Sequence, residues 1–244
     1  MNILVISGCS GDKQFDEAPI GCEELDSTSR DDLLETYPDY VAPAAEMYTG
    51  DEHERVRQAV ANLRSYANVT WRIVSAGYGV VAENERIVAY DCTLSDINAV
   101  RDRAKRMGHD PSALTIDETR QAVGRELNLS ADLKGELAEG YDLVFVTLSE
   151  PYLVATGEAF TELLERAVVF VFASKGAKPY VGDGYWVPAT EEVRASLGTT
   201  WFELRGELLW TFSESVDETA LAQLAATPES VEEFVSPISV HESE

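Results

Sequence analysis

Residues 71–91 read WRIVSAGYGVVAENERIVAYD. The run Ile73, Val74 and Ser75 has the apolar, β-branched character of a buried strand. Small residues follow it directly, so backbone amides can approach a ligand closely, and Tyr78 adds an aromatic hydroxyl at the strand's exit. This stretch predicts a strand that ends in the floor of a binding site.

Four apolar runs have the near-continuous apolarity of strands that are covered on both faces. They are residues 2–7, 70–75, 142–147 and 167–173. Helical patterns are expected between and after them, at residues 51–67, 94–107, 111–127 and 157–166. The alternation predicts a single α/β domain with a mixed or mostly parallel central sheet flanked by helices.

Three segments are expected along the chain: an α/β core at residues 1–175, a helical C-terminal extension packed on it at 176–236, and a flexible acidic tail at 237–244. An apolar stripe at helical spacing indicates the helix of the extension: Trp201, Leu204, Leu208, Leu209 and Phe212. Residues 11–43 show little periodicity, so we expect a long surface loop with one short helix near 31–36. Loops of this length are often lids.

The chain is strongly acidic, with 44 acidic against 19 basic residues and a formal charge of −25. Because the acidity is spread along the chain and lysine is scarce, we expect a protein adapted to high salt. In molar salt the Debye length falls to roughly 3 Å, so acidity alone does not exclude a polyanionic partner. Nonspecific binding of nucleic acid requires clustered cations, and the densest basic run, RDRAKR at 101–106, is expected to be a solvated helix face.

The cysteines and histidines show no metal-ligand spacing. Cys9, Cys22 and Cys92 form no CxxC pair, and His53, His109 and His241 complete no zinc pattern. We therefore expect reduced thiols and no metal. The start of the chain lacks the positive region of a signal peptide, and no apolar run approaches the roughly 20 residues of a membrane span, so we expect a cytoplasmic protein without a membrane partner.

Lys13 is the first candidate for chemistry. It is one of five lysines, and it follows the first strand through a Gly/Ser loop that also contains Ser10. A lysine in such a loop can hold an anion, or its pKa can shift when it is desolvated. The loop lacks the spacing of a Walker motif, which argues against a triphosphate cradle. The alternative is a solvated loop lysine.

A second loop places Tyr48, Thr49 and Gly50 before a helix that begins near Asp51. The amides of that helix's first turn could receive a phosphate or a carboxylate. The simpler alternative is that Thr49 or Asp51 caps the helix while Tyr48 packs beneath it.

Further polar residues follow other predicted strands. Tyr90 and Asp91 close the central stretch, and Ser149 and Tyr152 follow the strand at 142–147. Ligands of open α/β sheets bind at the carboxyl ends of the strands, so these loops are expected to share one pocket.

These residues together resemble the YaaA family of peroxide stress proteins. The matching elements are SGDK at 10–13, MYTG at 47–50, SAGYGV at 75–80 with Tyr90, and TLSEPY at 147–152. In the family they read S-x-x-K, VYTG, LSGLYGVL with a following PY, and NLAS-x-EY. The similarity covers residues 1–93 and 141–153, and it does not extend beyond residue 175.

The resemblance implies a cytoplasmic protein that limits oxidative damage, through DNA association or lowered free iron, and that has one polar pocket. A similar lysine-containing pocket in archaeosine synthase, which modifies a tRNA base, suggests by analogy a nucleotide, nucleobase or nucleic-acid ligand. The chain departs from the family in its acidity and shows no basic DNA-binding segment. The cofactor and the oligomeric state are not indicated.

Our first hypothesis assigns a role to each candidate. Lys13 is nucleophile or anchor, Tyr78 and Asp91 are acid/base groups, and the loops bind the ligand. The ligand-binding candidates are Ser10, Tyr48, Thr49, Gly50, Ser75, Gly77, Gly79, Tyr90, Ser149 and Tyr152. The alternatives are a non-catalytic stress protein that binds DNA or limits iron, and a generic scaffold in which the Gly and Tyr clusters are turns and core aromatics.

Overall fold

The computed structural model describes residues 1–161 and 167–235. The expected tail at 237–244 and half of the helix expected at 157–166 lie outside these ranges. Residues 157–161 form turns, and a helix that was not predicted, α8 (Glu150–Ala155), precedes them. Its start is defined by Ser149 at the N-cap and Pro151 in the first turn, where the missing amide of proline is tolerated.

A six-stranded sheet forms the centre of the molecule, in the order β10-β9-β8-β1-β4-β5. Its strands are β1 (Asn2–Gly8), β4 (Asn68–Ser75), β5 (Gly79–Ala82), β8 (Leu143–Thr147), β9 (Val168–Ala173) and β10 (Tyr185–Pro188). All neighbours pair in parallel except β4 and β5, which are antiparallel. The predicted α/β fold with a mostly parallel sheet is therefore confirmed.

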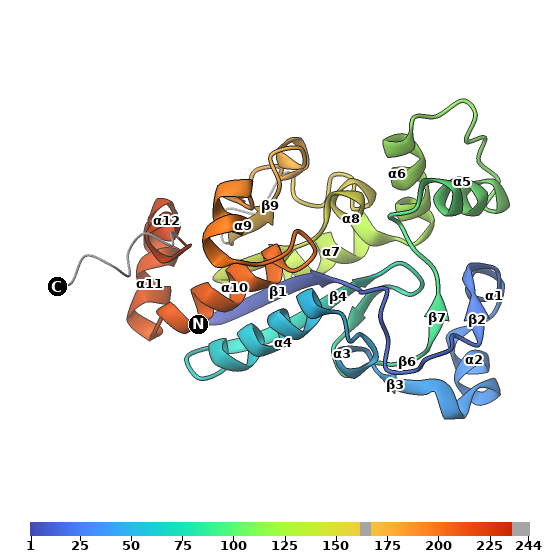
Figure 1. Ribbon diagram of the computed structural model, residues 1–244, viewed down its shortest axis with the longest axis horizontal. Coiled ribbons are helices and arrows are strands. Elements are labelled where there is room, and N and C mark those ends of the chain that lie inside the picture. Colours follow the sequence, from blue (N-terminus) through green and yellow to red (C-terminus); the bar gives the residue numbers. More distant parts are fainter. Residues whose placement is uncertain (162–166, 236–244) are drawn as a thin grey trace.

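Both faces of the sheet are buried, as the apolar runs predicted. In β1, Ile3 and Val5 belong to the core on one face, and Leu4 and Ile6 to the core on the other. The first face is covered by α4 (Asp51–Leu63), α10 (Leu204–Ser215), α11 (Glu218–Ala226) and α12 (Val231–Val235). The second is covered by α5 (Ile97–Arg106), α6 (Ile116–Glu126), α7 (Leu129–Ala138) and α8. Figure 1 shows these layers.

In the C-terminal segment, Leu204, Leu208 and Phe212 of α10 are buried against the first face. Trp201 precedes the helix and is 48% exposed, with the Arg194 guanidinium 5.7 Å from the centre of its ring. A strand, β10, also lies in this segment and pairs with β9, so the sheet continues past residue 175. The helix α9 (Glu191–Leu197) and the short 3₁₀ helices η2 (Lys178–Tyr180) and η3 (Pro228–Ser230) complete it.

Two helix expectations need correction. The helix expected at 111–127 begins only at α6, because Thr115 and Glu118 form a capping box there, while Asp110 accepts the amide of Ser112 in a local turn. The helix α7 was not predicted. It follows Asn128, which has the left-handed φ of 56° that ends α6 and redirects the chain.

Residues 11–43 contain more structure than the expected loop. They form β2 (Ile20–Gly21), α1 (Cys22–Ser27), α2 (Arg30–Thr36), η1 (Pro38–Tyr40) and β3 (Val41–Pro43), followed by α3 (Ala44–Met47). β2 pairs with β7 (Tyr90–Asp91), and β3 pairs with β6 (Arg86–Val88).

The expectation of reduced thiols is wrong for two of the three cysteines, since Cys22 and Cys92 form a disulfide. The fold brings the two cysteines together although they are 70 residues apart in the sequence. No local spacing rule detects such a pair.

The order of the strands identifies a topological switch point. From β1 the chain passes to β4 on one side and later to β8 on the other, so the connections diverge between β1 and β8. Ligands of doubly wound sheets bind at the carboxyl ends of the strands beside such a switch point. In Figure 1 these ends point toward the right-hand side, where α1, α5, α6 and β7 lie. No helix in the described residues is long and apolar enough to cross a membrane.

His53 of α4 is buried in the first face, next to the rings of Tyr48 and Trp71 at 5.5 and 5.0 Å. Its Nε2 lies 3.0 Å from the Ala45 carbonyl, which can only accept, so the proton is assigned to Nε2. Nδ1 is buried without a hydrogen-bond partner among the described residues. Burial lowers the pKa of His53 to about 4, because a charged imidazole would leave its second N–H unpaired.

This burial predicts a loss of stability in acid. The pKa of His53 is lower in the fold than its ordinary value of 6.5, so its contribution is complete above pH 6.5 and declines as the pH falls toward 4. Between pH 7.5 and 4.5 the loss from this one group is on the order of 2–3 kcal/mol. Urea unfolding of wild type and His53→Gln at both pH values measures it. We expect a smaller pH dependence in the variant, and equal pH dependence would contradict the assignment.

Candidate functional site

A polar cluster lies at the carboxyl edge of the sheet, assembled from five separate segments. It comprises Cys9 after β1, Lys13 in the following loop, Tyr48 after α3, Ser75 at the end of β4, Tyr90 in β7 and Tyr152 in α8. We call these six residues the edge cluster. The loops that the sequence predicted to converge are therefore brought together.

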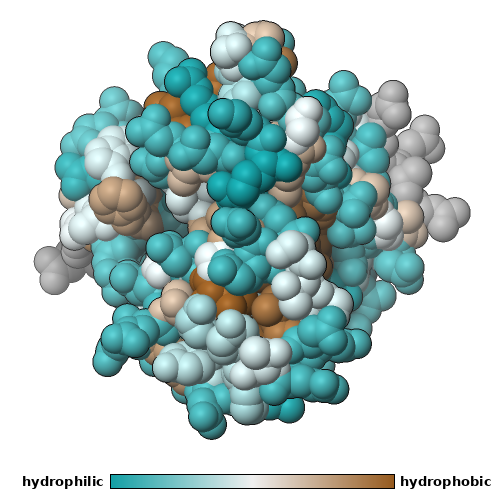
Figure 2. All heavy atoms as spheres, turned by 90° about the vertical axis from the view of Figure 1, so that its right-hand side faces the viewer, coloured by the Kyte–Doolittle hydropathy of each residue, from teal (hydrophilic) through white to brown (hydrophobic). Residues whose placement is uncertain are grey.

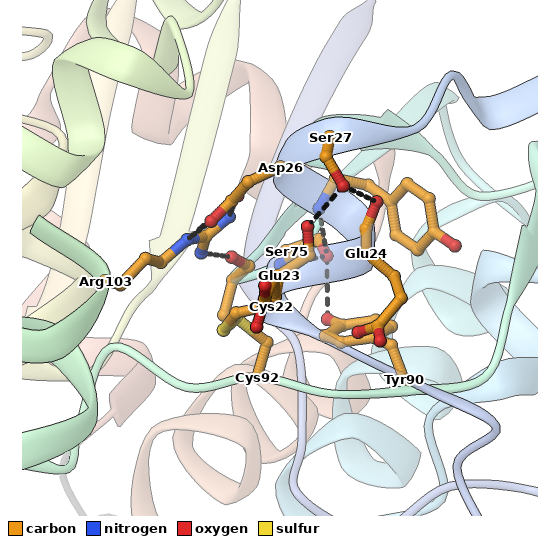
Figure 3. A network of polar contacts seen from close by, with 12 residues as sticks. Cys22, Glu23, Glu24, Asp26, Ser27, Ser75, Tyr90, Cys92 and Arg103 are labelled. Carbon is orange, nitrogen blue, oxygen red and sulfur yellow. Dashed lines mark hydrogen bonds and ion pairs between the residues drawn. A yellow bond between two sulfur atoms is a disulfide. The ribbon is translucent and has the colours of Figure 1, made fainter. Parts of the chain in front are cut away.

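Ser75 is the buried centre of the edge cluster. Its Oγ lies 3.1 Å from the Tyr48 hydroxyl and 2.7 Å from that of Tyr90, and the two hydroxyls are 3.0 Å apart. The same Oγ accepts the amides of Gly77 and Tyr78, at 3.1 and 3.0 Å. Ser75, Tyr48 and Tyr90 are 0% exposed, so this part of the edge cluster holds the turn after β4 in place. Figure 3 shows Ser75 and Tyr90.

Cys9 and Tyr152 span the switch point between β1 and β8. The Cys9 thiol lies 3.1 Å from the Tyr152 hydroxyl and accepts the Ala76 amide at 3.4 Å. Cys9 was not predicted as a site residue, because a free cysteine more often fills a core position. Its place directly after the first strand was the signal that could have identified it.

Lys13 is the partly buried cation of the edge cluster. Its Nζ is 4.7 Å from the centre of the Tyr90 ring and donates to the Gly11 carbonyl at 3.1 Å. Burial lowers the pKa of Lys13, and the charges of Cys9, Asp91 and Asp12 partly oppose that shift. A backbone bridge between Lys13 and Tyr48 fixes the lysine loop against the second loop.

The three tyrosine hydroxyls remain neutral at ordinary pH. Burial is the main cause that raises the pKa of Tyr48, Tyr90 and Tyr152, and the neighbouring Cys9 raises each of them further. The edge cluster therefore presents neutral hydroxyls that can donate or accept hydrogen bonds, beside a thiol and an amine. Thr147 Oγ1, at the end of β8, is also buried and has no partner within residues 1–161 and 167–235.

Other predicted residues brace the loops. Ser10 Oγ accepts the Gly50 amide at 3.1 Å, and a Cβ on Gly50 would come within 2.6 Å of the Ser10 Cβ. Gly50 itself is the N-cap of α4, so neither Thr49 nor Asp51 caps that helix. Thr49 is exposed, and its amide donates to the Asp12 carbonyl.

Four residues that the sequence predicted for the site lie outside the edge cluster. The Tyr78 hydroxyl is bound to the backbone of Val88 at 3.2 Å, and burial raises its pKa to about 12. Asp91 is exposed and acts on the edge cluster through its charge near Lys13. Gly79 has a left-handed φ of 76° in the turn into β5, and Ser149 makes no side-chain cap bond.

The surface above this edge is uneven. Figure 2 views it and shows hydrophobic atoms within a recess between hydrophilic side chains. A separate depression of about 750 Å³ lies over α5 and the following loop, lined by Arg101, Lys105 and His109 among others. It shares no residue with the edge cluster, so we assign the site from the converging polar groups. In the described ranges, no three His, Cys, Asp or Glu side chains are grouped to hold a metal ion.

One family model matches part of the chain. Residues 35–112 are similar to DUF6884, a family of unknown function. The matched segment includes Tyr48, Ser75 and Tyr90 but not Cys9 or Lys13. No curated protein and no solved structure matches the chain.

Proposed function

We propose that the edge cluster binds a nucleobase or nucleotide component and acts on it, in a cytoplasmic protein of YaaA type. The observation that supports this most is the convergence of Cys9, Lys13 and Tyr152 at the switch point, where doubly wound sheets bind ligands. The sequence motifs shared with the peroxide stress proteins are the support for a role in limiting oxidative damage.

The chemistry of the edge cluster suits a planar, heteroatom-rich ligand. Neutral hydroxyls such as that of Tyr152 both donate and accept, and so can match the edge of a heterocyclic base. Lys13 would hold an anionic group, or attack as a neutral amine, because burial lowers its pKa. Asp91, an exposed carboxylate whose charge acts on Lys13, would be the acid/base group rather than Tyr78, whose hydroxyl is bound to the β6 backbone.

Replacing Lys13 tests this proposal. A panel of free bases, nucleosides and nucleoside 5′-monophosphates is screened by thermal unfolding in molar KCl. We expect at least one ligand to raise the Tm of the wild type, and Lys13→Ala to lose at least about 100-fold in affinity, as expected when roughly 2.7 kcal/mol of anion binding is removed.

Lys134→Ala is the matched control, because Lys134 is an exposed lysine of α7 outside the edge cluster. It should keep the full ligand response. If Lys13→Ala also keeps it, Lys13 has no part in binding. Iron(II) and duplex DNA are titrated in parallel, and tight stoichiometric binding of either to Lys13→Ala would favour the non-catalytic alternative.

A further inference from the structure

The helix α1 covers the turn that the edge cluster holds. Leu25 of α1 approaches Gly77 so closely that a Cβ there would lie 2.8 Å from the Leu25 Cδ1, and the Tyr90 ring packs against Gly77 as well. Opening α1 would therefore expose the Gly77 turn and one side of Tyr90.

Partial burial contributes to the position of α1, because Cys22 and Leu25 pack against the core. None of the six residues is fully buried, and helices of this length are marginal in isolation. The following helix, α2, is different, because Leu33 anchors it in the core. The short pairing of β2 with β7 adds only two residue pairs, Ile20 with Tyr90 and Gly21 with Asp91.

Two side-chain links fasten α1 to the body of the protein (Figure 3). Asp26 pairs with Arg103 of α5 at 2.5 Å, and Arg103, 1% exposed, also donates to the Ala76 carbonyl. The second link is the disulfide, which joins the first residue of α1 to Cys92, with the two Cα atoms 5.2 Å apart. Cys92 lies two residues beyond Tyr90 in the chain.

We propose that the Cys22–Cys92 disulfide is a redox latch that holds α1 over the edge cluster, and that its reduction opens access to the site. The control of ligand access rests on the proposed function, whereas the release of α1 does not. In a cytoplasm, disulfides are rare and are commonly redox-sensing, which agrees with this role.

The reducing partner is a dithiol. One of its thiolates attacks Sγ of Cys22, the more exposed of the two cysteines, and the S–S bond breaks with Cys92 leaving as a thiolate that takes up a proton. The second thiol of the reductant then displaces Cys22 as a thiol. Two electrons pass to the protein, and the reductant becomes a disulfide.

Hydrogen exchange of the full chain, without ligand, tests the latch. Oxidised protein is compared with protein reduced by dithiothreitol. We expect the amides of residues 22–27 to exchange on the order of tenfold faster after reduction, with those of Gly77 and Tyr78 also accelerated, while β1 and β8 stay unchanged. Cys22→Ser should show the fast exchange with or without reductant.

Two results would overturn the latch. Equal exchange at residues 22–27 in both states would mean that the disulfide does not hold α1. Acceleration in β1 and β8 as well would mean that it supports the whole fold. The nucleotide panel is then repeated in both redox states: if no ligand raises the Tm in either, the proposed function fails, while the exchange result still decides the latch.

Discussion

Ser75→Ala is expected to lower the free energy of unfolding by about 4 kcal/mol, because several buried groups lose a partner at once. The amides of Gly77 and Tyr78 would lose their acceptor, and the hydroxyls of Tyr48 and Tyr90 would keep only each other. In a domain of this size the Tm should fall by roughly 8–16 °C. Urea and thermal unfolding measure both quantities.

Ser230→Ala is the control for loss of a buried serine hydroxyl. Ser230 is 8% exposed, and among the described residues its hydroxyl donates only to the carbonyl of Thr227, the N-cap of η3. The same carbonyl also accepts the Ser230 amide. That variant should lose less than about 1 kcal/mol. Equal losses in the two variants would contradict the central role of Ser75 in the edge cluster.

Gly124→Ala is expected to destabilise the protein by roughly 3 kcal/mol, the upper end for an overpacked core. A Cβ on Gly124 would lie 1.9 Å from the Ala155 carbonyl oxygen, so α6 and α8 must separate. Because α8 carries Tyr152, we also expect weaker ligand stabilisation in this variant. Thermal unfolding with and without ligand measures both effects.

Gly135→Ala is the matched control in a neighbouring helix. Apart from its chain neighbours and the backbone of its own helix, no described atom lies within 4 Å of a Cβ built on Gly135 in α7, and its φ is not in the left-handed region. Alanine there should raise stability by up to about 1 kcal/mol, through helix propensity alone. A destabilising Gly135→Ala, or a neutral Gly124→Ala, would contradict the close packing of α6 on α8.

The central sheet could be predicted from sequence because its strands are buried on both faces. β8 is buried at all five positions, so its apolar run is continuous and unambiguous. β10 escaped prediction because it is a four-residue edge strand whose partly exposed Tyr185 and Trp186 break that pattern. Such a strand is defined by its neighbour rather than by its own composition.

The candidate site was predictable in outline for a similar reason. Polar loops that follow the parallel strands β4 and β8 meet at one edge, which places Ser75 and Tyr152 there. Tyr48 and Tyr90 reach the same edge through their contacts with Ser75. The direction of each side chain depends on packing that sequence does not encode locally. Tyr78 therefore appeared to be a site residue, although its hydroxyl is bound to the backbone of β6.

Contacts between residues far apart in the sequence were the other feature that could not be predicted. The disulfide closes a separation of 70 residues, and the thiol of Cys9 meets Tyr152 across 143 positions. Neither pair has a local spacing pattern, because each depends on how β1, β7 and β8 are arranged in the fold. The Cys9–Tyr152 pair lies in the edge cluster, and the disulfide holds α1.

A crystal structure with the panel ligand that raises the Tm most shows directly whether the edge cluster is a binding site. We expect ligand density at the carboxyl ends of β1 and β8, in contact with Cys9 and Tyr152 and within reach of the Lys13 amine. Density confined to the depression over α5, or to any surface away from the edge cluster, would contradict it.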